Sequence, residues 1–205
     1  MRTQTKRSSF GALLFNQTLA AAGLAFFIFF VLYTDKGQSL LFKYEFTVFV
    51  LNWLAHKIQG FSNWDWLWGS GLILLMGVGN VIQQHFIFKT DLSQMEWLPH
   101  SGWQKAGFVY LVFTTAFTEE IVFRGVILPA VSFWLFPSAG LLISAGLFGV
   151  LHAEKGWRGQ VAVGVYGVIL GGALLIGASL WVCIIAHGLN NVVALFILPA
   201  ARSQT

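Results

Sequence analysis

Long runs of apolar residues, separated by short polar segments, dominate the chain. An apolar helix needs about 20 residues to cross a bilayer, and most of these runs reach or approach that length. The runs lie at about 10–33, 40–55, 67–88, 106–128, 138–153, 160–176 and 178–198. This pattern predicts an all-α fold, a polytopic transmembrane helical bundle with about seven to eight spans or re-entrant helices.

Two of these runs have unusual lengths. The run at 10–33 follows a basic N-terminus and resembles a signal peptide, but it is longer than the 7–15 apolar residues of such a peptide. We therefore expect a retained span. The run at 138–153 is short for a full crossing. We expect it either to be tucked inside the bundle or to be extended by the segment before Pro137.

Proline, charge and glycine indicate where the helices end and how they pack. Pro129 and Pro137 are expected to break the chain after the fourth run, because proline lacks the N–H of a helical hydrogen bond. The charged residues at 154–159 predict a turn. Gly167 and Gly171 form a Gly-x-x-x-Gly spacing, which lets two helix backbones approach closely.

Composition indicates that this helical pattern belongs to a membrane protein. Of the 205 residues, 57% are hydrophobic and only 10% are charged, and the mean hydropathy is +0.72. Soluble domains have about 25% charged residues. We expect one integral membrane domain over residues 1–205, with a motif-bearing core at about 106–198, embedded in the lipid bilayer. The small size favours a multi-pass protein of a bacterial or archaeal cell membrane.

Charge and cysteine content exclude other classes of protein. The net charge of +4 comes from scattered basic residues rather than from the basic patch of a nucleic-acid binder, so no nucleic-acid partner is expected. The single cysteine, Cys183, rules out an internal disulfide and a multi-cysteine metal site.

One of the apolar runs contains three ionisable residues, Glu119, Glu120 and Arg124. A charge at the centre of a membrane helix costs about 2.5–3.5 kcal/mol on insertion scales, so such charges are usually functional or paired. Glu120 and Arg124 are four residues apart and share a helix face, which predicts an ion pair. Glu119 points elsewhere and has Phe123 four positions later, so its carboxylate is left for chemistry. The structural alternative places both glutamates in one ion-pair cluster that locks helices together.

Polar side chains also interrupt two later runs. His152 ends one of them, and His187 and Asn191 share a helix face on the other, being four residues apart. Each has an ordinary explanation, as an interfacial histidine or as a hydrogen bond between helices. However, ionisable groups inside membranes tend to face the bundle interior or a water-filled cavity. We therefore expect these three side chains to converge with Glu119.

Such a set of side chains supports hydrolysis. Glu119, helped by His152, is placed to deprotonate a water that attacks a carbonyl carbon. His187 and Asn191 are then the donors for the oxyanion that develops, a contribution of about 2.7–4 kcal/mol for each donor.

The motifs at these residues resemble those of a known family. Glu-Glu-x-x-x-Arg at 119–124, Phe-x-x-x-His at 148–152 and His-x-x-x-Asn at 187–191 follow one another in the order found in the CAAX protease and bacteriocin-processing family. The segment at 179–181 is also similar. Members of this family are intramembrane glutamic endopeptidases, and the resemblance covers about residues 117–191.

The resemblance implies roles for six residues. Glu119 and His152 match the water-activating pair, His187 and Asn191 match the oxyanion-stabilising pair, and Glu120 and Arg124 match positions that support the site. It implies no metal and no cofactor. It also implies a peptide or protein substrate, for which prenylated proteins, membrane-associated proteins and other peptides are all candidates.

Three alternatives differ from this interpretation in chemistry or class. Glu119, His152 and His187 form a His₂Glu set, which is a ligand set of catalytic zinc, although no His-Glu-x-x-His motif is present. Cys183 lies four residues before His187 and shares its helix face, as a Cys–His pair would require. The third alternative is a membrane protein without peptidase activity, acting in bacteriocin immunity, binding or transport.

Overall fold

The computed structural model describes residues 44–59, 62–86, 102–153 and 156–193, and these ranges contain helices and no β-strand. The helices are α3 (Tyr44–Ile58), α4 (Asn63–Phe86), α5 (Gly102–Glu120), the π-helix η2 (Ile121–Ile127), α6 (Leu128–Trp134), α7 (Pro137–Val150), α8 (Gly156–Leu175) and α9 (Leu180–Val192). The predicted all-α class is confirmed for this part of the chain. The span expected at 10–33 lies outside the described residues, so the total number of spans stays a prediction.

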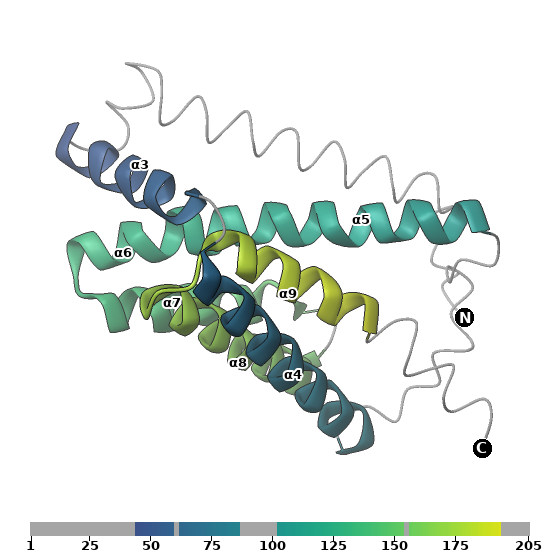
Figure 1. Ribbon diagram of the computed structural model, residues 1–205. Helices are drawn as coiled ribbons and strands as arrows, with labels where there is room; N and C mark the ends of the chain where they lie inside the picture. The colour runs from purple at the N-terminus through teal and green to yellow at the C-terminus, as the bar shows by residue number, and fades with distance from the viewer. Residues whose placement is uncertain (1–43, 60–61, 87–101, 154–155, 194–205) are drawn as a thin grey trace.

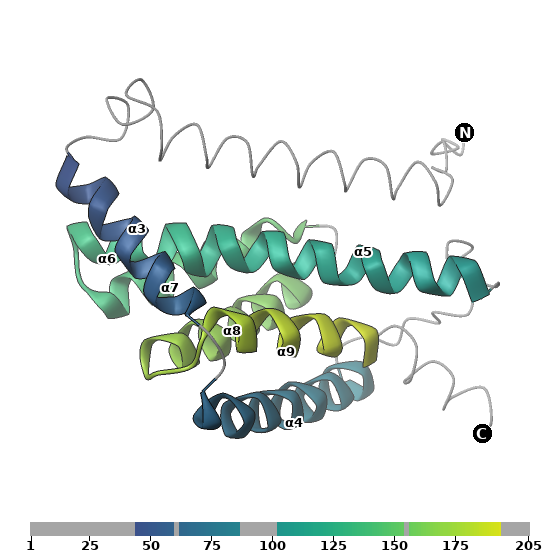
Figure 2. The same ribbon diagram turned by 45° about the horizontal axis from the view of Figure 1, so that its top comes forward.

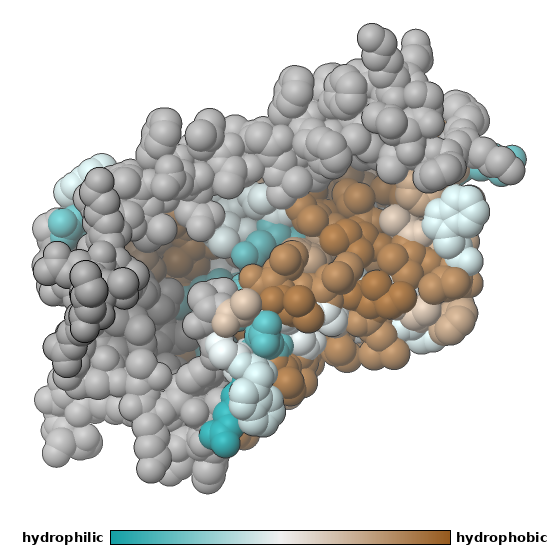
Figure 3. All heavy atoms as spheres, turned by 180° about the vertical axis from the view of Figure 1, so that it is seen from behind, coloured by the Kyte–Doolittle hydropathy of each residue, from teal (hydrophilic) through white to brown (hydrophobic). Residues whose placement is uncertain are grey.

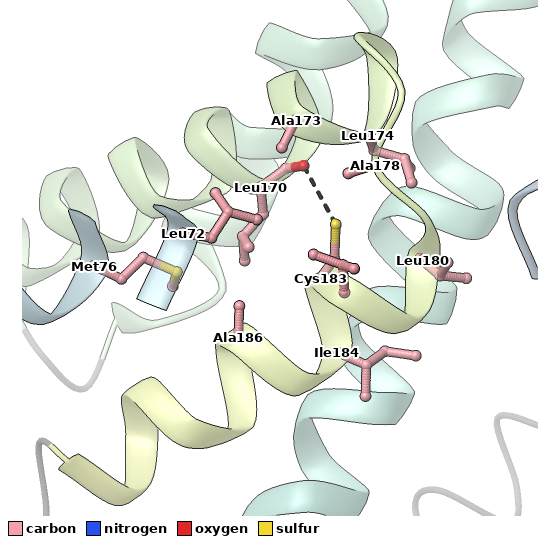
Figure 4. Packing of buried hydrophobic residues seen from close by; sticks show 11 residues of the cluster. Leu72, Met76, Leu170, Ala173, Leu174, Ala178, Leu180, Cys183, Ile184 and Ala186 are labelled. Carbon is pink, nitrogen blue, oxygen red and sulfur yellow. Dashed lines mark hydrogen bonds between the residues drawn. The ribbon is translucent and has the colours of Figure 1, made fainter. Parts of the chain in front are cut away.

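Helix α9 lies in the middle of the bundle. It packs against α5 on one side and against α4 on the other (Figures 1 and 2). Most of its residues are buried, from Leu180 at its beginning to Asn190 near its end. An apolar cluster joins the first half of α9 to α4 and α8 (Figure 4). Side chains on α9 therefore face the interior of the protein in several directions.

The outer surface of the bundle is apolar. Large apolar side chains on α4, α7 and α8 are exposed, among them Leu74, Leu142, Leu147, Val161 and Val165. Figure 3 shows a broad hydrophobic surface on the face opposite to that of Figure 1. Within the described ranges, Trp64–Ile82 and Gly156–Leu175 are long and apolar enough to cross a membrane. An apolar exterior around buried charges is the arrangement expected in lipid.

The break expected at Pro129 is wrong, because the chain changes its helical register before reaching this proline. In η2 the backbone widens, and the N–H of Leu128 reaches the carbonyl of Phe123, five residues back. Pro129 then falls in the first turn of α6. Continuing the same register would pair its missing N–H with the carbonyl of Arg124. Trp53 of α3 donates its indole N–H to that carbonyl at 3.2 Å.

The break comes instead at the second proline. Phe136 has an extended backbone, and Pro137 begins α7, which folds back against α6 (Figure 1). Because α6 and α7 form a hairpin, α6 does not extend α7. Helix α7 is not fully tucked inside either, since Leu142 and Val150 are exposed. Both expectations for this run are therefore corrected. The predicted turn at 154–159 is shorter than expected, because α8 begins at Gly156, whose φ of +68° suits glycine.

Glycines bring the helices close together, as the Gly-x-x-x-Gly spacing predicts. A Cβ on Gly167 of α8 would lie 3.0 Å from the Cα of Ala145 on α7, and one on Gly171 would lie 2.6 Å from Leu141. On α7, a Cβ at Gly149 would lie 2.5 Å from the backbone oxygen of Gln160. These contacts run along both helices, and the one at Gly149 holds the end of α7 against the beginning of α8.

Candidate active site

Three helices bring one carboxylate and two imidazoles together. Glu119 lies in the last turn of α5, His152 follows the end of α7, and His187 lies on α9. The Oε1 atom of Glu119 is 3.9 Å from Nε2 of His152, and its Oε2 atom is 3.6 Å from Nε2 of His187. The three side chains are 24%, 18% and 8% exposed, respectively. The carboxylate thus faces both imidazoles in a partly open site.

The local backbone explains where His152 points. Its amide N–H bonds to the carbonyl of Gly149 at 3.1 Å, in a turn that closes α7. Its ring nitrogen Nδ1 lies 2.8 Å from the carbonyl oxygen of Phe148. Because a carbonyl oxygen only accepts, Nδ1 carries the hydrogen, and Nε2 of the neutral ring has a lone pair that faces Glu119.

A buried cluster of charges lies next to this carboxylate. Arg124 Nη1 is 3.1 Å from Oε1 of Glu120, so the ion pair predicted from their spacing is present. The same Oε1 is 2.9 Å from Nδ1 of His187. Arg124 also donates from Nη2 to the carbonyl of Gly167 at 3.4 Å. Glu120 and Arg124 are almost fully buried. His187 therefore links the buried ion pair to Glu119. Both glutamates belong to one connected network, so the structural alternative and a separate role for Glu119 do not exclude each other.

The contact between Glu120 and His187 has a consequence for proton positions. An ionised carboxylate only accepts hydrogen bonds, so Nδ1 of His187 donates to Glu120. A neutral His187 then has a lone pair at Nε2, as His152 does. Nε2 of His187 can donate only when the ring is doubly protonated.

Phe148 joins these groups and was not assigned a role of its own from the sequence. Its ring lies edge-on to the ring of His152, with centroids 4.8 Å apart, and to that of His187 at 5.8 Å. The guanidinium of Arg124 lies over its face, 4.6 Å from the centroid. The Phe-x-x-x-His spacing was the available signal, because positions four apart share one side of a helix.

Asn191 is the predicted site residue for which the structure gives the least contact. It is half-buried on α9 and makes no side-chain hydrogen bond with the described residues. Its neighbour Asn190 is buried and bonds to Asn80 of α4 at 2.7 Å. The role of Asn191 as an oxyanion donor stays a prediction.

Cys183 lies in different surroundings from those of a nucleophile. It is fully buried in the apolar cluster between α4, α8 and α9, and its Sγ points to the carbonyl of Leu170 at 3.6 Å (Figure 4). Such a cysteine behaves as a small apolar side chain. Within the described residues, no group of three His, Cys, Asp or Glu side chains is arranged to hold a metal ion.

The arrangement favours chemistry on a water molecule. A distance of 3.9 Å between Glu119 and His152 is too long for a direct hydrogen bond. It allows one water oxygen to lie within hydrogen-bond distance of both groups. A water in that position could lose a proton to either of them.

A comparison with protein families identifies the segment that carries the site. Residues 101–193 match the family model described as type II CAAX prenyl endopeptidase Rce1-like. No curated protein and no solved structure gives a significant match. The matched segment begins just before α5 and ends with α9, so it contains all six predicted site residues and leaves out α3 and α4.

Proposed function

We propose, from the match of residues 101–193 to the family model described as type II CAAX prenyl endopeptidase Rce1-like, that this chain is an intramembrane glutamic endopeptidase. The family is membrane-embedded and acts on peptide or protein substrates, so the coarse activity is that of a membrane protease. The finer mechanism rests on one observation: the carboxylate of Glu119 faces Nε2 of both His152 and His187.

In the first step, Glu119 and His152 activate a water held between them. The water gives a proton to Glu119 or to Nε2 of His152, and its oxygen forms a bond with the carbonyl carbon of the substrate. The lone pair at Nε2 supports this role for His152, since Phe148 fixes the hydrogen on Nδ1. General base catalysis of this kind contributes about 10²–10⁴-fold to the rate.

In the second step, His187 and Asn191 stabilise the tetrahedral oxyanion. His187 donates from Nε2, which requires the doubly protonated ring with Glu120 as its acceptor at Nδ1. Glu120 and Arg124 thereby support the site without touching the substrate. When the intermediate collapses, the C–N bond breaks, and the proton taken from water passes to the leaving amine.

The substrate class proposed is a prenylated or otherwise membrane-associated peptide. Its apolar part would remain in the lipid, and this matches the apolar outer surface of the bundle (Figure 3). No metal takes part in the proposed mechanism. The zinc-hydrolase and binding-only alternatives are outcomes of the following experiment.

The test uses the full chain, reconstituted in lipid nanodiscs and incubated with three probes. These are a farnesylated peptide ending in a Cys-aliphatic-aliphatic-X sequence, its unprenylated form, and an unrelated transmembrane peptide. We expect mass spectrometry to detect cleavage of at least one probe. Cleavage should fall by about 10²–10⁴-fold in Glu119→Gln and in His152→Ala, while thermal unfolding shows that both variants are folded.

Two results would overturn the proposal. Unchanged cleavage by a folded Glu119→Gln variant would remove the proposed base. Activity that strong chelation abolishes and added zinc restores would establish the zinc alternative. If no probe is cleaved, comparing the peptides of cells that carry wild type or Glu119→Gln tests the proposal directly, because a protease must leave uncut peptides in the variant cells. Identical peptide profiles would favour the binding or immunity alternative.

A further inference from the structure

Helix α4 lies along α9 and is attached to it near both ends. The two helices are side by side in both ribbon views (Figures 1 and 2). In the first turn of α4, Oδ1 of Asp65 accepts a hydrogen bond from the backbone N–H of Ser179 at 3.0 Å, where α9 begins. Further along, Nδ2 of Asn80 lies 2.7 Å from Oδ1 and 3.2 Å from the carbonyl oxygen of Asn190.

Both attachments are buried, and the second is held by a third helix. Asp65, Asn80 and Asn190 are each less than one-tenth exposed. The hydroxyl of Tyr166 on α8 is 3.0 Å from Oδ1 of Asn80 and 3.2 Å from the carbonyl of Met76. Because Asn80 contacts α8 and α9 together, its amide has a fixed direction. Hydrogen bonds in such an apolar setting are directional constraints that apolar packing does not supply.

The attachment at Asn190 lies close to the candidate active site along α9. Asn190 is three residues after His187, and the intervening Gly188 packs against the ring of Phe113 on α5. A Cβ at Gly188 would be 2.6 Å from that ring. Helix α9 is therefore held by close packing on its α5 side and by hydrogen bonds on its α4 side.

The rotation of α9 about its axis decides whether His187 reaches its partners. A side chain on a helix extends about 5–6 Å from the axis, so a rotation of about 20° moves its tip by roughly 2 Å. Catalytic groups must be held within about 0.5 Å of their working positions. His187 is 2.9 Å from Glu120 and 3.6 Å from Glu119, and a shift of that size would break both contacts.

We propose that α4 positions α9 through its buried hydrogen bonds. Asn80 is the principal positioning residue, and Tyr166 holds the amide of Asn80 in place. The hydrogen bonds from α4 set the rotation of α9 about its axis and so direct His187 towards Glu119 and Glu120. This proposal rests on the proposed function for its effect on catalysis. It assigns a role in the site to a helix that the family match does not include.

The first experiment separates positioning from stability with three variants: Asn80→Leu, Asn190→Leu and the double variant. Replacing one partner leaves a buried polar group unpaired, whereas replacing both with apolar groups of similar shape can be nearly neutral for stability. We expect the double variant to recover the unfolding temperature lost in the single variants. Its kcat should nevertheless stay about 10²-fold below that of wild type, with KM little changed. Recovery of both unfolding temperature and kcat would overturn the proposal.

A second measurement does not depend on cleavage of any substrate. Diethyl pyrocarbonate acylates accessible imidazole nitrogens, and mass spectrometry of peptides measures the rate at each histidine. We expect Asn80→Leu to raise the rate at His187 and to leave that at His152 unchanged, because His152 follows α7 and not α9. Equal increases at both histidines would indicate a loosened bundle and contradict the proposal. No change at either histidine would also contradict it.

Matched variants complete the test. Tyr166→Phe removes only the hydroxyl that holds Asn80, so it should change the modification rate at His187 in the same direction but by less. Ser70→Ala on α4 removes a hydroxyl that bonds within its own helix, to the carbonyl of Trp66, and should change nothing. If wild type cleaves no probe and the cell peptides do not differ, the proposed protease function fails, while the modification rates still decide whether α4 positions α9.

Discussion

Glu119 and Glu120 are neighbours in the chain but lie in two different parts of the site. The Glu119 side chain is 24% exposed and faces His152 and His187 at distances too long for direct hydrogen bonds. Glu120 is fully buried and contacts both Arg124 and His187 at about hydrogen-bond distance. The first environment is partly open, and the distance between Glu119 and His152 allows a water molecule to bridge them. The second is closed, and Oε1 of Glu120 faces both of its partners there.

The difference shows how one helix places two neighbouring carboxylates in different environments. Successive residues on a helix point in directions about 100° apart, so two adjacent carboxylates can face an open site and a closed core. His187 connects the two environments through its two ring nitrogens. The buried Glu120 can therefore orient the ring of His187 that faces Glu119, because a hydrogen bond at one ring nitrogen fixes the role of the other.

The largest expected effect follows from breaking the buried ion pair of Glu120 and Arg124. Arg124→Met leaves the Glu120 carboxylate buried without its cation, and breaking a buried pair in this way typically costs about 3–5 kcal/mol of unfolding free energy. Denaturant unfolding in detergent micelles measures the loss. Glu119→Gln, one residue from Glu120, should change the unfolding free energy by no more than about 0.5 kcal/mol. Similar losses in the two variants would contradict the distinction between the two glutamates.

A smaller effect is expected where α7 approaches α8, since this contact places His152 near Glu119. Gly149→Ala puts a Cβ 2.5 Å from the backbone oxygen of Gln160. Overpacking of this kind costs about 1–3 kcal/mol, and the displaced end of α7 should also lower cleavage. Gly146→Ala on the same helix is the control, because a Cβ there meets nothing within 4 Å. Equal behaviour of the two variants in unfolding and cleavage would refute this account.

The next effect concerns the π-helical segment that follows both glutamates. Trp53→Phe removes the indole N–H that bonds to the carbonyl of Arg124, leaving a partly buried acceptor unpaired. Loss of such a bond costs about 1–2 kcal/mol, which should appear as a lower unfolding temperature in micelles. Trp64→Phe at an exposed position should leave that temperature unchanged. An unaltered unfolding temperature in Trp53→Phe would mean that η2 does not need this bond.

The smallest effect is expected at Cys183, which shares α9 with His187 but lies in the apolar cluster. Cys183→Ser should retain cleavage, because the serine hydroxyl can donate to the carbonyl of Leu170 that Sγ now contacts. Cleavage rates and unfolding temperatures of the two proteins provide the comparison. A folded but inactive Cys183→Ser variant would instead support the Cys–His alternative.

Spacing along the chain predicted the features that depend on residues sharing one face of a helix. The ion pair of Glu120 with Arg124 and the close packing at Gly167 and Gly171 followed from residues that share a helix face. The expected break at Pro129 failed, because the sequence does not show that a tryptophan from α3 would replace the missing hydrogen bond. The network between Glu120 and His187 was also missed, since it joins residues 67 positions apart.

The sequence alone predicted a helical membrane protein with acidic, imidazole and amide side chains on apolar segments, and the helical class is confirmed for the described residues. Hydrophobicity and spacing are local properties, and they decide which residues form helices and which share a face. The tertiary structure decided which carboxylate faces both histidines, which nitrogen of each ring is already occupied, and that α4 lies along α9. These features depend on how separate helices rotate and approach one another, and that is fixed by packing and buried hydrogen bonds between residues far apart in the chain.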